Sequence, residues 1–471
     1  TYTTQDIGRA GTGYVNNYNG NLTLIHDDLS MSGNRMPISI NHVFNNYERT
    51  RNIGYGNGFR LNLAQTIERK KYGNDWYYEH IDEDGTKQRY KDDGGTTLKN
   101  EVQEELTLTK NSDGTFTIKD TEDSKLNFKD GKLISVEDSN GNKMTIDYWN
   151  NKISKVTDGS GRVVTLNYNG QGLLGEIVYP DGRKNTYEYS GNSLTKITYP
   201  DGKSSSYEYE GDNRIMHATD YTGNRVRYVY YNMSTYRMST VIANNVDGEE
   251  NSRVNFEYGD NSTKITDNAG KYSCYQFDNT GKTISIRDDE GSAKYYKYGA
   301  SSNKGKITEE SKMQKSVINL LGNPGAESEQ CWWFIKDGGN GAGEYTTSEK
   351  YDGNNNLIKT TTPKGTSFNY KYDDKHKLVQ SNDLKIRYIR DTLGGNTVNT
   401  DNTWMEIKAL DEKGNNVAQG KKVTSNEKDA VGSRANVVDG NIEGQCYQTD
   451  STNSTTISWV QIDLGKKYSI E

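Results

Sequence analysis

Acidic side chains, 65 in all, are the most numerous groups in this chain that could carry chemistry, and many lie just before a glycine. Two examples are Asp82–Asp84 before Gly85 and Asp288–Glu290 before Gly291. A glycosidase would place two such carboxylates across a cleft. Aspartate is also frequent in turns, because its side chain accepts hydrogen bonds from nearby backbone N–H groups. Since the arrangement recurs in unit after unit, the sequence favours turns over a catalytic pair.

The five histidines show no spacing typical of a metal site or a catalytic site. They lie far apart in the sequence, at His26, His42, His80, His217 and His376. Histidine is a frequent metal ligand, acid or base, but without local clustering we expect hydrogen-bonded or surface side chains. The sequence also lacks a nucleophile elbow, a phosphate-binding loop, an HExxH motif and a CxxC motif. We therefore predict a protein that is not an enzyme and needs no cofactor.

Three consecutive aromatic residues, Trp332, Trp333 and Phe334, could contact a carbohydrate. An aromatic face suits the apolar side of a pyranose ring. Successive side chains of a strand point to opposite faces, so at most alternate members of the three share a surface. Packing in the core of an insert is the competing interpretation. Trp332 and Trp333 are therefore predicted as sugar contacts, with core packing as the alternative.

The elements that position these residues are predicted to be β-strands. Hydrophobic content is only 31%, which is typical of disorder in many chains. However, the 35 tyrosines supply large apolar area with a polar hydroxyl, so a tyrosine-rich sheet can be ordered without much Leu or Val. The 48 glycines, many of them in Asn-Gly and Asp-Gly pairs, indicate tight turns. No convincing amphipathic helix is present.

Charge and cysteine content limit the partners and the location of the protein. With a net charge of -7, the chain is a poor binder of nucleic acid. No apolar run approaches the ~18 residues of a membrane span. The cysteines, Cys274, Cys331 and Cys446, are odd in number and far apart, so no disulfide framework is predicted. The chain begins at Thr1 without a signal peptide, so we expect a fragment or mature piece of a longer protein.

A period of 20 to 21 residues runs through the middle of the chain. Aromatic residues recur at this spacing, at Phe128, Tyr148, Tyr168, Tyr189, Tyr209 and Tyr230. Glycines keep the same spacing, at Gly141, Gly161, Gly182, Gly202 and Gly223. Two residue classes with one period indicate a structural repeat. Such repeats form surfaces and walls far more often than active sites.

Each repeat is predicted to be one β-hairpin. In one unit, residues 185–189 alternate so that Tyr187 and Tyr189 share a face, and residues 194–199 return with Ile197 on that face. Two strands and two short turns fill the period. An isolated hairpin is marginally stable in water. We therefore expect successive hairpins to stack into one continuous curved sheet with a Tyr/Ile face and a polar face.

The period stops at three places, and these breaks define the predicted domains and the places where we expect ligands to bind. It stops at about 231–250, at 316–350 and after 385. The predicted domains are an N-terminal β region, the repeats, an insert, a further repeat and a C-terminal module, at 1–110, 111–315, 316–350, 351–385 and 386–471.

The repeats resemble the YD repeat of the RHS family, which includes bacterial secreted or surface proteins, the shell of insecticidal toxin complexes, and teneurins in animals. The resemblance is carried by residues 351–359, 363–365 and 370–373. Residues 20–22, 33–40 and 56–62 look like the region that precedes the repeats in large members. Residues 319–327 resemble the start of a carbohydrate-binding module inserted in RHS proteins.

The C-terminal segment is similar to a discoidin-type module, a β-sandwich that often binds carbohydrate. The similarity is carried by residues 432–435, 438–441 and 459–465. It implies a calcium site beside Asp439 and Asn441, whose oxygen donors on a tight loop suit calcium. It also makes Trp459 a candidate sugar contact. A plain Asp-Gly-Asn turn is the alternative to calcium.

Taken with the resemblance, the leading hypothesis is a mainly β, noncatalytic bacterial protein that is secreted or lies at the cell surface. Its hairpins would form part of a β-shell that encloses or delivers a C-terminal toxin cargo in the full-length protein. The alternative is a carbohydrate-binding adhesin with glycan partners, and a weaker alternative is a polysaccharide-degrading enzyme.

Overall fold

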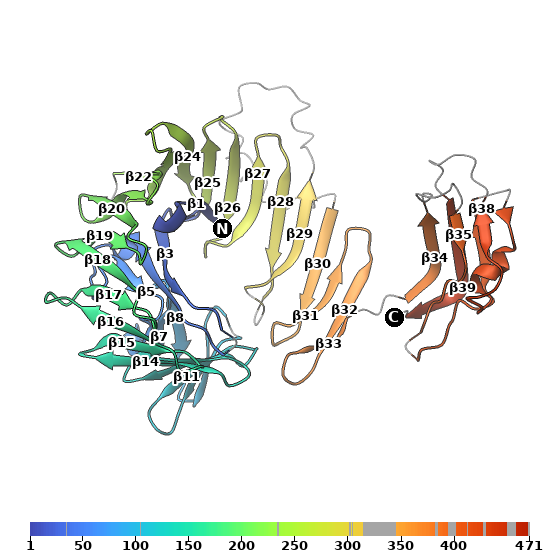
Figure 1. Ribbon diagram of the computed structural model, residues 1–471, viewed down its shortest axis with the longest axis horizontal. Helices are drawn as coiled ribbons and strands as arrows, with labels where there is room; N and C mark the ends of the chain where they lie inside the picture. Colours follow the sequence, from blue (N-terminus) through green and yellow to red (C-terminus); the bar gives the residue numbers. More distant parts are fainter. Residues whose placement is uncertain are drawn as a thin grey trace. The chain divides into compact units, whose positions relative to one another are not determined.

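The computed structural model describes residues 1–33, 35–103, 105–232, 235–300, 303, 305–313, 345–381, 385–393, 402–411, 413–426, 430–449 and 458–469. Two compact units divide the chain. One comprises Thr1–Ile358 with Tyr372–Lys377, and the other Lys359–Lys371 with Leu378–Glu471. The described residues form β-strands with a few short 3-10 helices (Figure 1), which confirms the prediction of a mainly β fold. None of the helices in these residues is long and apolar enough to cross a membrane.

A five-stranded antiparallel sheet opens the chain, with its strands in sequence order. Its elements are β1 (Tyr2–Asp6), η1 (Gly8–Ala10), β2 (Thr12–Asn16), β3 (Leu22–Ser30), β4 (Ser39–Asn45), η2 (Asn46–Glu48) and β5 (Phe59–Leu61). Side chains alternate between buried and less buried along β3, as expected for a strand with one face in the core. We call this the N-terminal sheet.

A second, much longer antiparallel sheet follows, in which β6 to β30 are arranged in sequence order. Its first strands are β6 (Thr66–Tyr72), β7 (Asp75–Ile81), β8 (Lys87–Lys91), β9 (Thr97–Lys99), β10 (Thr107–Lys110), β11 (Phe116–Lys119), β12 (Lys125–Lys129) and β13 (Lys132–Glu137). β13 also pairs with β6 through Lys132 and Thr66, so β6–β13 form a closed ring of strands, here called the ring.

The long sheet continues as a series of hairpins. Its strands are β14 (Lys143–Trp149), β15 (Lys152–Thr157), β16 (Val163–Tyr168), β17 (Leu174–Val178), β18 (Lys184–Ser190), β19 (Ser193–Thr198), β20 (Ser204–Glu210), β21 (Arg214–Thr219), β22 (Arg225–Tyr230), β23 (Met238–Asn244), β24 (Glu250–Gly259), β25 (Ser262–Asp267), β26 (Tyr272–Phe277), β27 (Thr283–Asp288), β28 (Ala293–Tyr298), β29 (Ile307–Met313) and β30 (Tyr345–Tyr351). Three further strands are β31 (Leu357–Thr361), β32 (Ser367–Tyr372) and β33 (Leu378–Ser381).

The hairpin prediction is confirmed in detail by β18 and β19. Tyr187 and Ile197 are buried and Glu188 is exposed, so the apolar face is the one that the alternation indicated. The register shifts between Glu188 and Tyr189, at the periodic aromatic residue. The same shift recurs at the periodic aromatic residue of most other hairpins, between β12 and β13, β14 and β15, β16 and β17, β20 and β21, β22 and β23, β26 and β27, and β28 and β29. A β-bulge bends its strand, so a repeated bulge curves the sheet.

The periodic tyrosines all make the same type of hydrogen bond, and we call them the tyrosine ladder. Each hydroxyl donates to a backbone carbonyl 15 residues earlier: Tyr148 to Leu133 (2.7 Å), Tyr168 to Ile153 (2.8 Å), Tyr189 to Leu174 (2.8 Å), Tyr209 to Leu194 (2.5 Å), Tyr230 to Ile215 (2.9 Å) and Tyr298 to Thr283 (2.7 Å). Leu174, for example, pairs with Tyr168 at the bulge of the preceding hairpin. The ladder therefore joins each hairpin to the bulge of the one before it.

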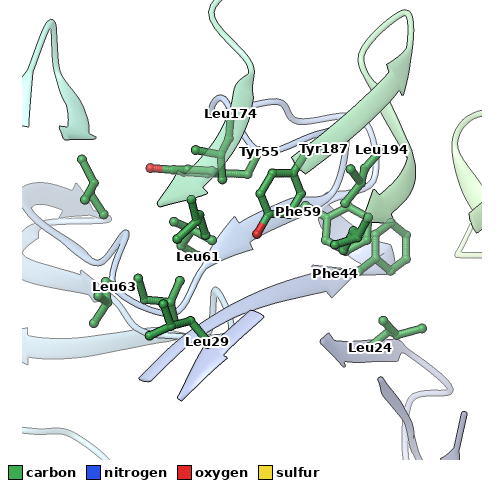
Figure 2. Close-up of a cluster of buried hydrophobic side chains, with 14 of the residues drawn as sticks. Leu24, Leu29, Phe44, Tyr55, Phe59, Leu61, Leu63, Leu174, Tyr187 and Leu194 are labelled. Atoms are coloured by element: carbon green, nitrogen blue, oxygen red, sulfur yellow. The ribbon is translucent and has the colours of Figure 1, made fainter. Parts of the chain in front are cut away.

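The main core lies between the N-terminal sheet and the apolar face of the long sheet. In Figure 2, Phe44 and Phe59 of the N-terminal sheet lie close to Tyr187 and Leu194 of β18 and β19, and all four belong to one buried cluster. Burying one such Leu or Phe side chain stabilises the folded state by about 1.5–3 kcal/mol. The N-terminal sheet therefore covers part of the face that the repeats could not bury by themselves.

The second unit contains two three-stranded sheets that share a core. One consists of β34 (Lys385–Leu393), β39 (Ser458–Ser469) and β36 (Lys422–Ser425), and the other of β35 (Asn402–Trp404), β38 (Tyr447–Thr449) and β37 (Ala430–Val431), with η5 (Arg434–Val438) beside them. Trp404, Tyr447, Val460, Ile462 and Leu464 are buried in this core. It is separate from the core of the first unit.

Candidate functional site

Of the three predicted sugar contacts, only Trp459 belongs to the described residues. Trp332 and Trp333 lie outside the described residues. Trp459 lies on β39, where the guanidinium of Arg390 sits 4.1 Å from the centre of its indole ring. Its backbone N–H donates to Oδ1 of Asn426 at 2.7 Å. One face of the indole is thus occupied by Arg390, and sugar contact by Trp459 stays a prediction.

Asp439 and Asn441, the predicted calcium ligands, lie in an exposed turn after η5. Oδ1 of Asp439 accepts a hydrogen bond from the N–H of Asn441 at 2.8 Å, and Oδ1 of Asn441 accepts one from Glu443 at 3.0 Å. The N–H of Gly440 donates to Glu406 at 3.1 Å. The side-chain oxygens therefore already shape an Asp-Gly-Asn turn, and calcium binding stays a prediction.

The aspartates before glycines form turns, as predicted. Oδ1 of Asp82 accepts a hydrogen bond from the N–H of Thr86 at 2.9 Å. Oδ1 of Asp288 accepts hydrogen bonds from Glu290 at 3.1 Å and Ser292 at 2.8 Å. In each turn, some backbone N–H groups have no backbone carbonyl as acceptor. The carboxylate oxygen of the aspartate accepts their hydrogen bonds instead.

Two of the scattered histidines meet in space. His26 on β3 and His42 on β4 are directly paired across the N-terminal sheet, and Asp28 lies between them. Nδ1 of His42 lies 2.8 Å from Oδ2 of Asp28, and Nδ1 of His26 lies 3.4 Å from Oδ1. None of these three side chains is exposed to solvent. Sequence spacing missed the group because the cross-strand register of β3 and β4 creates it.

The long sheet completes this group. The hydroxyl of Tyr187 donates to Oδ1 of Asp28 at 2.6 Å, and the hydroxyl of Tyr199 lies 2.9 Å from Nε2 of His26. We call His26, Asp28, His42, Tyr187 and Tyr199 the Asp28 cluster. It links the N-terminal sheet to β18 and to the turn after β19.

Electrostatics favour the ionised form of Asp28. Burial raises the pKa of this carboxyl, but the charges and hydrogen bonds of His42 and His26 outweigh burial and hold the pKa well below its usual range. Burial, and then the negative charge of Asp28, raises the pKa of Tyr187 well above its ordinary value. Because the cluster is sealed from solvent, a substrate has no access, and the arrangement fastens two sheets together.

A solvent-accessible cavity with both apolar and polar lining lies at one end of the ring. Its volume is about 360 Å³, and its polar lining includes His80, Asp82, Gln88, Gln103, Asp120 and Lys125. We call it the ring cavity. Three connections at the same end of the ring form its rim: the turn between β7 and β8, the connection between β9 and β10, and the turn between β11 and β12. Mouths of closed sheets are frequent ligand sites.

Two groups in the ring cavity have shifted pKa values. Burial, followed by the hydrogen bond and the charge of Asp84, raises the pKa of Asp82 to about 7. Burial lowers the pKa of His80 to about 4, and its Nε2 lies 2.8 Å from Oε1 of Gln65. At neutral pH the cavity therefore contains a neutral imidazole and a carboxyl that is protonated in part of the molecules.

The ring cavity does not lie at any of the three predicted ligand-binding breaks. The break at 231–250 instead contacts the N-terminal sheet: Nδ2 of Asn46 donates to the carbonyl of Tyr236 at 3.3 Å, and the N–H of Met238 donates to Gly20 at 2.9 Å. The guanidinium of Arg49 lies 4.7 Å from the ring centre of Tyr236. This break therefore serves docking between sheets. Most of the break at 316–350 lies outside the described residues, whereas most of the segment after 385 is described and forms the two small sheets of the second unit.

Comparison with known proteins finds weak similarity to solved structures. No family model and no curated protein matches the chain. A crystal structure of TcdB2-TccC3-Cdc42 is 9% identical with a TM-score of 0.32, over 79% of this chain and 24% of that chain. TcdB2-TccC3 without its hypervariable C-terminal region is 9% identical with a TM-score of 0.33, over 93% and 27%. A Photorhabdus luminescens Tc holotoxin pore is 10% identical with a TM-score of 0.31, over 79% and 24%. The chain thus spans about a quarter of the length of these structures.

Proposed function

We propose that this chain is a noncatalytic wall segment of an RHS/YD-repeat protein that bacteria export and that encloses a polypeptide cargo such as a toxin. One observation carries the proposal: the long sheet curves back to its own beginning. Nδ2 of Asn355, in the turn after β30, donates to Oε2 of Glu105, before β10, at 2.9 Å. Nζ of Lys306 lies 3.8 Å from the same carboxylate.

The two faces of the sheet suit a wall. The face toward the N-terminal sheet carries buried Tyr and Ile side chains, and the opposite face carries exposed charged residues such as Glu188. Bulges at a constant place in most hairpins curve the sheet in one direction. Each strand within the series is paired on both sides, so its backbone groups are not open to edge-to-edge aggregation.

The state of the cysteines supports export. Cys274, on β26, is disulfide-bonded, whereas Cys446 is a free thiol. The cysteine spacing had predicted no disulfide framework, so this bond was not foreseen. Disulfides persist in oxidising surroundings and are rare in the bacterial cytoplasm. We therefore propose a secreted or surface location.

Protection of a cargo from proteolysis tests the proposal. The complete natural gene product would be treated with a nonspecific protease under native conditions, beside its C-terminal polypeptide expressed alone. If the sheet encloses this polypeptide, the polypeptide should resist digestion in the complete gene product and be degraded when it is expressed alone. Equal digestion in both samples would contradict enclosure.

An assay for glycan hydrolysis tests separately the proposal that the chain is noncatalytic. We expect no hydrolysis of cell-wall or host glycans by the purified chain. Hydrolysis that is abolished by one Asp or Glu substitution would overturn that part and favour a polysaccharide-degrading enzyme.

A further inference from the structure

The ring cavity is built into the closed part of the sheet. Its rim comes from three turns or connections, but its walls come from paired strands, including β7, β8, β11, β12 and β13. Strand walls hold side chains more rigidly than loops do. The volume of about 360 Å³ lies within the range of small-molecule sites.

The cavity combines an apolar side with hydrogen-bonding groups of both kinds. Its apolar side consists of Leu106, Ile118, Leu126 and Val136. The amide groups of Gln88 and Gln103 can donate and accept hydrogen bonds. The carboxylates of Glu83 and Asp120 accept them, and the partly protonated carboxyl of Asp82 can do either. A ligand with many hydroxyl groups and a saturated C–H surface matches both parts.

Several polar groups are held in place by their neighbours. Nε2 of Gln88 donates to Oδ2 of Asp82 at 3.3 Å, and its Oε1 accepts from Asn100 at 3.2 Å. Oδ1 of Asp120 accepts from the N–H groups of Glu122 and Ser124, both at 2.9 Å. These bonds orient the side chains before a ligand arrives, which lowers the entropy cost of binding.

The charges of the lining exclude other classes of ligand. Three carboxyl groups, of Asp82, Glu83 and Asp120, face one ammonium, and that ammonium of Lys125 already contacts Glu137 at 2.7 Å. An anion would therefore meet net negative charge. Among the described residues, no group of three or more His, Cys, Asp and Glu side chains is arranged to hold a metal ion. A wholly apolar ligand would leave unused the hydrogen-bonding capacity of the amides and carboxyl groups that their neighbours do not satisfy.

We propose that the ring cavity binds a neutral polyhydroxylated ring compound, a monosaccharide or the terminal unit of a glycan. Gln88 and Asp120 bond its hydroxyl groups, and the aliphatic side chains pack against its C–H face. This binding site is independent of the wall function, since the proposed wall requires no ligand.

The experiment titrates the full chain with D-glucose, D-galactose, D-mannose and N-acetyl-D-glucosamine, and with β-linked and α-linked disaccharides of glucose, by ligand-observed NMR. We expect saturable binding of at least one sugar. Asp120→Asn and Gln88→Leu should each weaken it at least tenfold. Tighter binding of a disaccharide would identify a glycan terminus, and equal binding would identify the free monosaccharide.

Asp138→Asn is the matched control. Oδ1 of Asp138 makes the same two turn bonds, to the N–H groups of Asn140 and Asn142 at 2.9 Å, but Asp138 does not line the cavity. It should leave binding unchanged. Gln103→Trp, at an exposed rim position between β9 and β10, should block the cavity without changing the turn bonds of Asp82 and Asp120. Absence of binding by every sugar, or binding that survives Gln103→Trp, would overturn the proposal.

Discussion

The hydroxyl of each ladder tyrosine explains why tyrosine, rather than phenylalanine, dominates the period. It reaches a backbone carbonyl at the bulge of the preceding hairpin, as Tyr189 reaches Leu174. Composition predicted that tyrosine would supply buried area with a polar group. The acceptor could not be predicted, because its position depends on a register shift that no residue type specifies. Phe128, at the start of the series, is fully buried without a hydroxyl.

Tyr189→Phe should lower the free energy of unfolding by about 1–2 kcal/mol, because it removes one hydrogen bond from the carbonyl of a buried residue. Urea denaturation followed by tryptophan fluorescence measures the change. Tyr221→Phe is the control, since Tyr221 is 42% exposed and should tolerate the loss of its hydroxyl. Equal effects of the two substitutions would show that the ladder bond contributes nothing specific.

Asp28 makes stability depend on pH. Its pKa in the folded protein lies below the ordinary value of 3.8, because His42 and His26 outweigh the effect of burial. Its contribution is therefore fully present above about pH 4, and it is lost as the pH falls through the folded pKa. Asp28→Asn should cost about 3–5 kcal/mol at pH 7, because it leaves buried donors without their charged partner.

The pH series distinguishes a charge effect from a packing effect. Below pH 3.8, the difference between wild type and Asp28→Asn should shrink by about 1.4 kcal/mol for each pH unit. Urea denaturation at pH 7, 5 and 3 measures it. A difference that stays constant across this range would contradict the charge effect. Asp201→Asn, at an exposed ion pair with Arg9, should change stability little at any pH.

At the scale of elements, periodicity predicted the hairpins correctly but did not show that β6–β9 belong to the same sheet as the repeats. These strands belong to the long sheet, although residues 66–110 show no period. A period reports identical surroundings, and these strands instead close the ring, where each side chain meets a different neighbour. The ring cavity could not be predicted for the same reason: its lining residues follow no period and share no motif. The Asp28 cluster was hidden because a one-residue change of register between β3 and β4 would separate its members.

Close packing of β2 against β22 leads to a prediction about glycine. A Cβ at Gly13 would collide with the hydroxyl of Tyr228. Gly13→Ala should therefore cost about 1–3 kcal/mol, because the N-terminal sheet must shift away from the long sheet. Gly170→Ala is the matched control, since a Cβ there meets no atom within 4 Å. Thermal denaturation of both variants measures the effect, and a tolerated Gly13→Ala would show that the two sheets pack loosely.

At the scale of the whole molecule, the described residues form two separate hydrophobic cores. The first joins the N-terminal sheet to the long sheet, and the second lies between the two small sheets of the C-terminal unit. Fold class and hairpin architecture were predictable, since both follow from local alternation and turn residues. The packing of the N-terminal sheet onto the repeats was not, because it joins segments such as β2 and β22 that lie far apart in the sequence.

Separate cores predict separate unfolding transitions, since cooperativity requires shared contacts. Differential scanning calorimetry of the full chain should resolve two transitions. Leu194 is buried in the first core and Ile462 in the second, and neither is exposed. Leu194→Ala should lower only one transition temperature and Ile462→Ala only the other, each substitution costing about 2–5 kcal/mol in its own unit. If either substitution shifted both transitions equally, the two units would unfold as one, and the second core would have to be stabilised by the first.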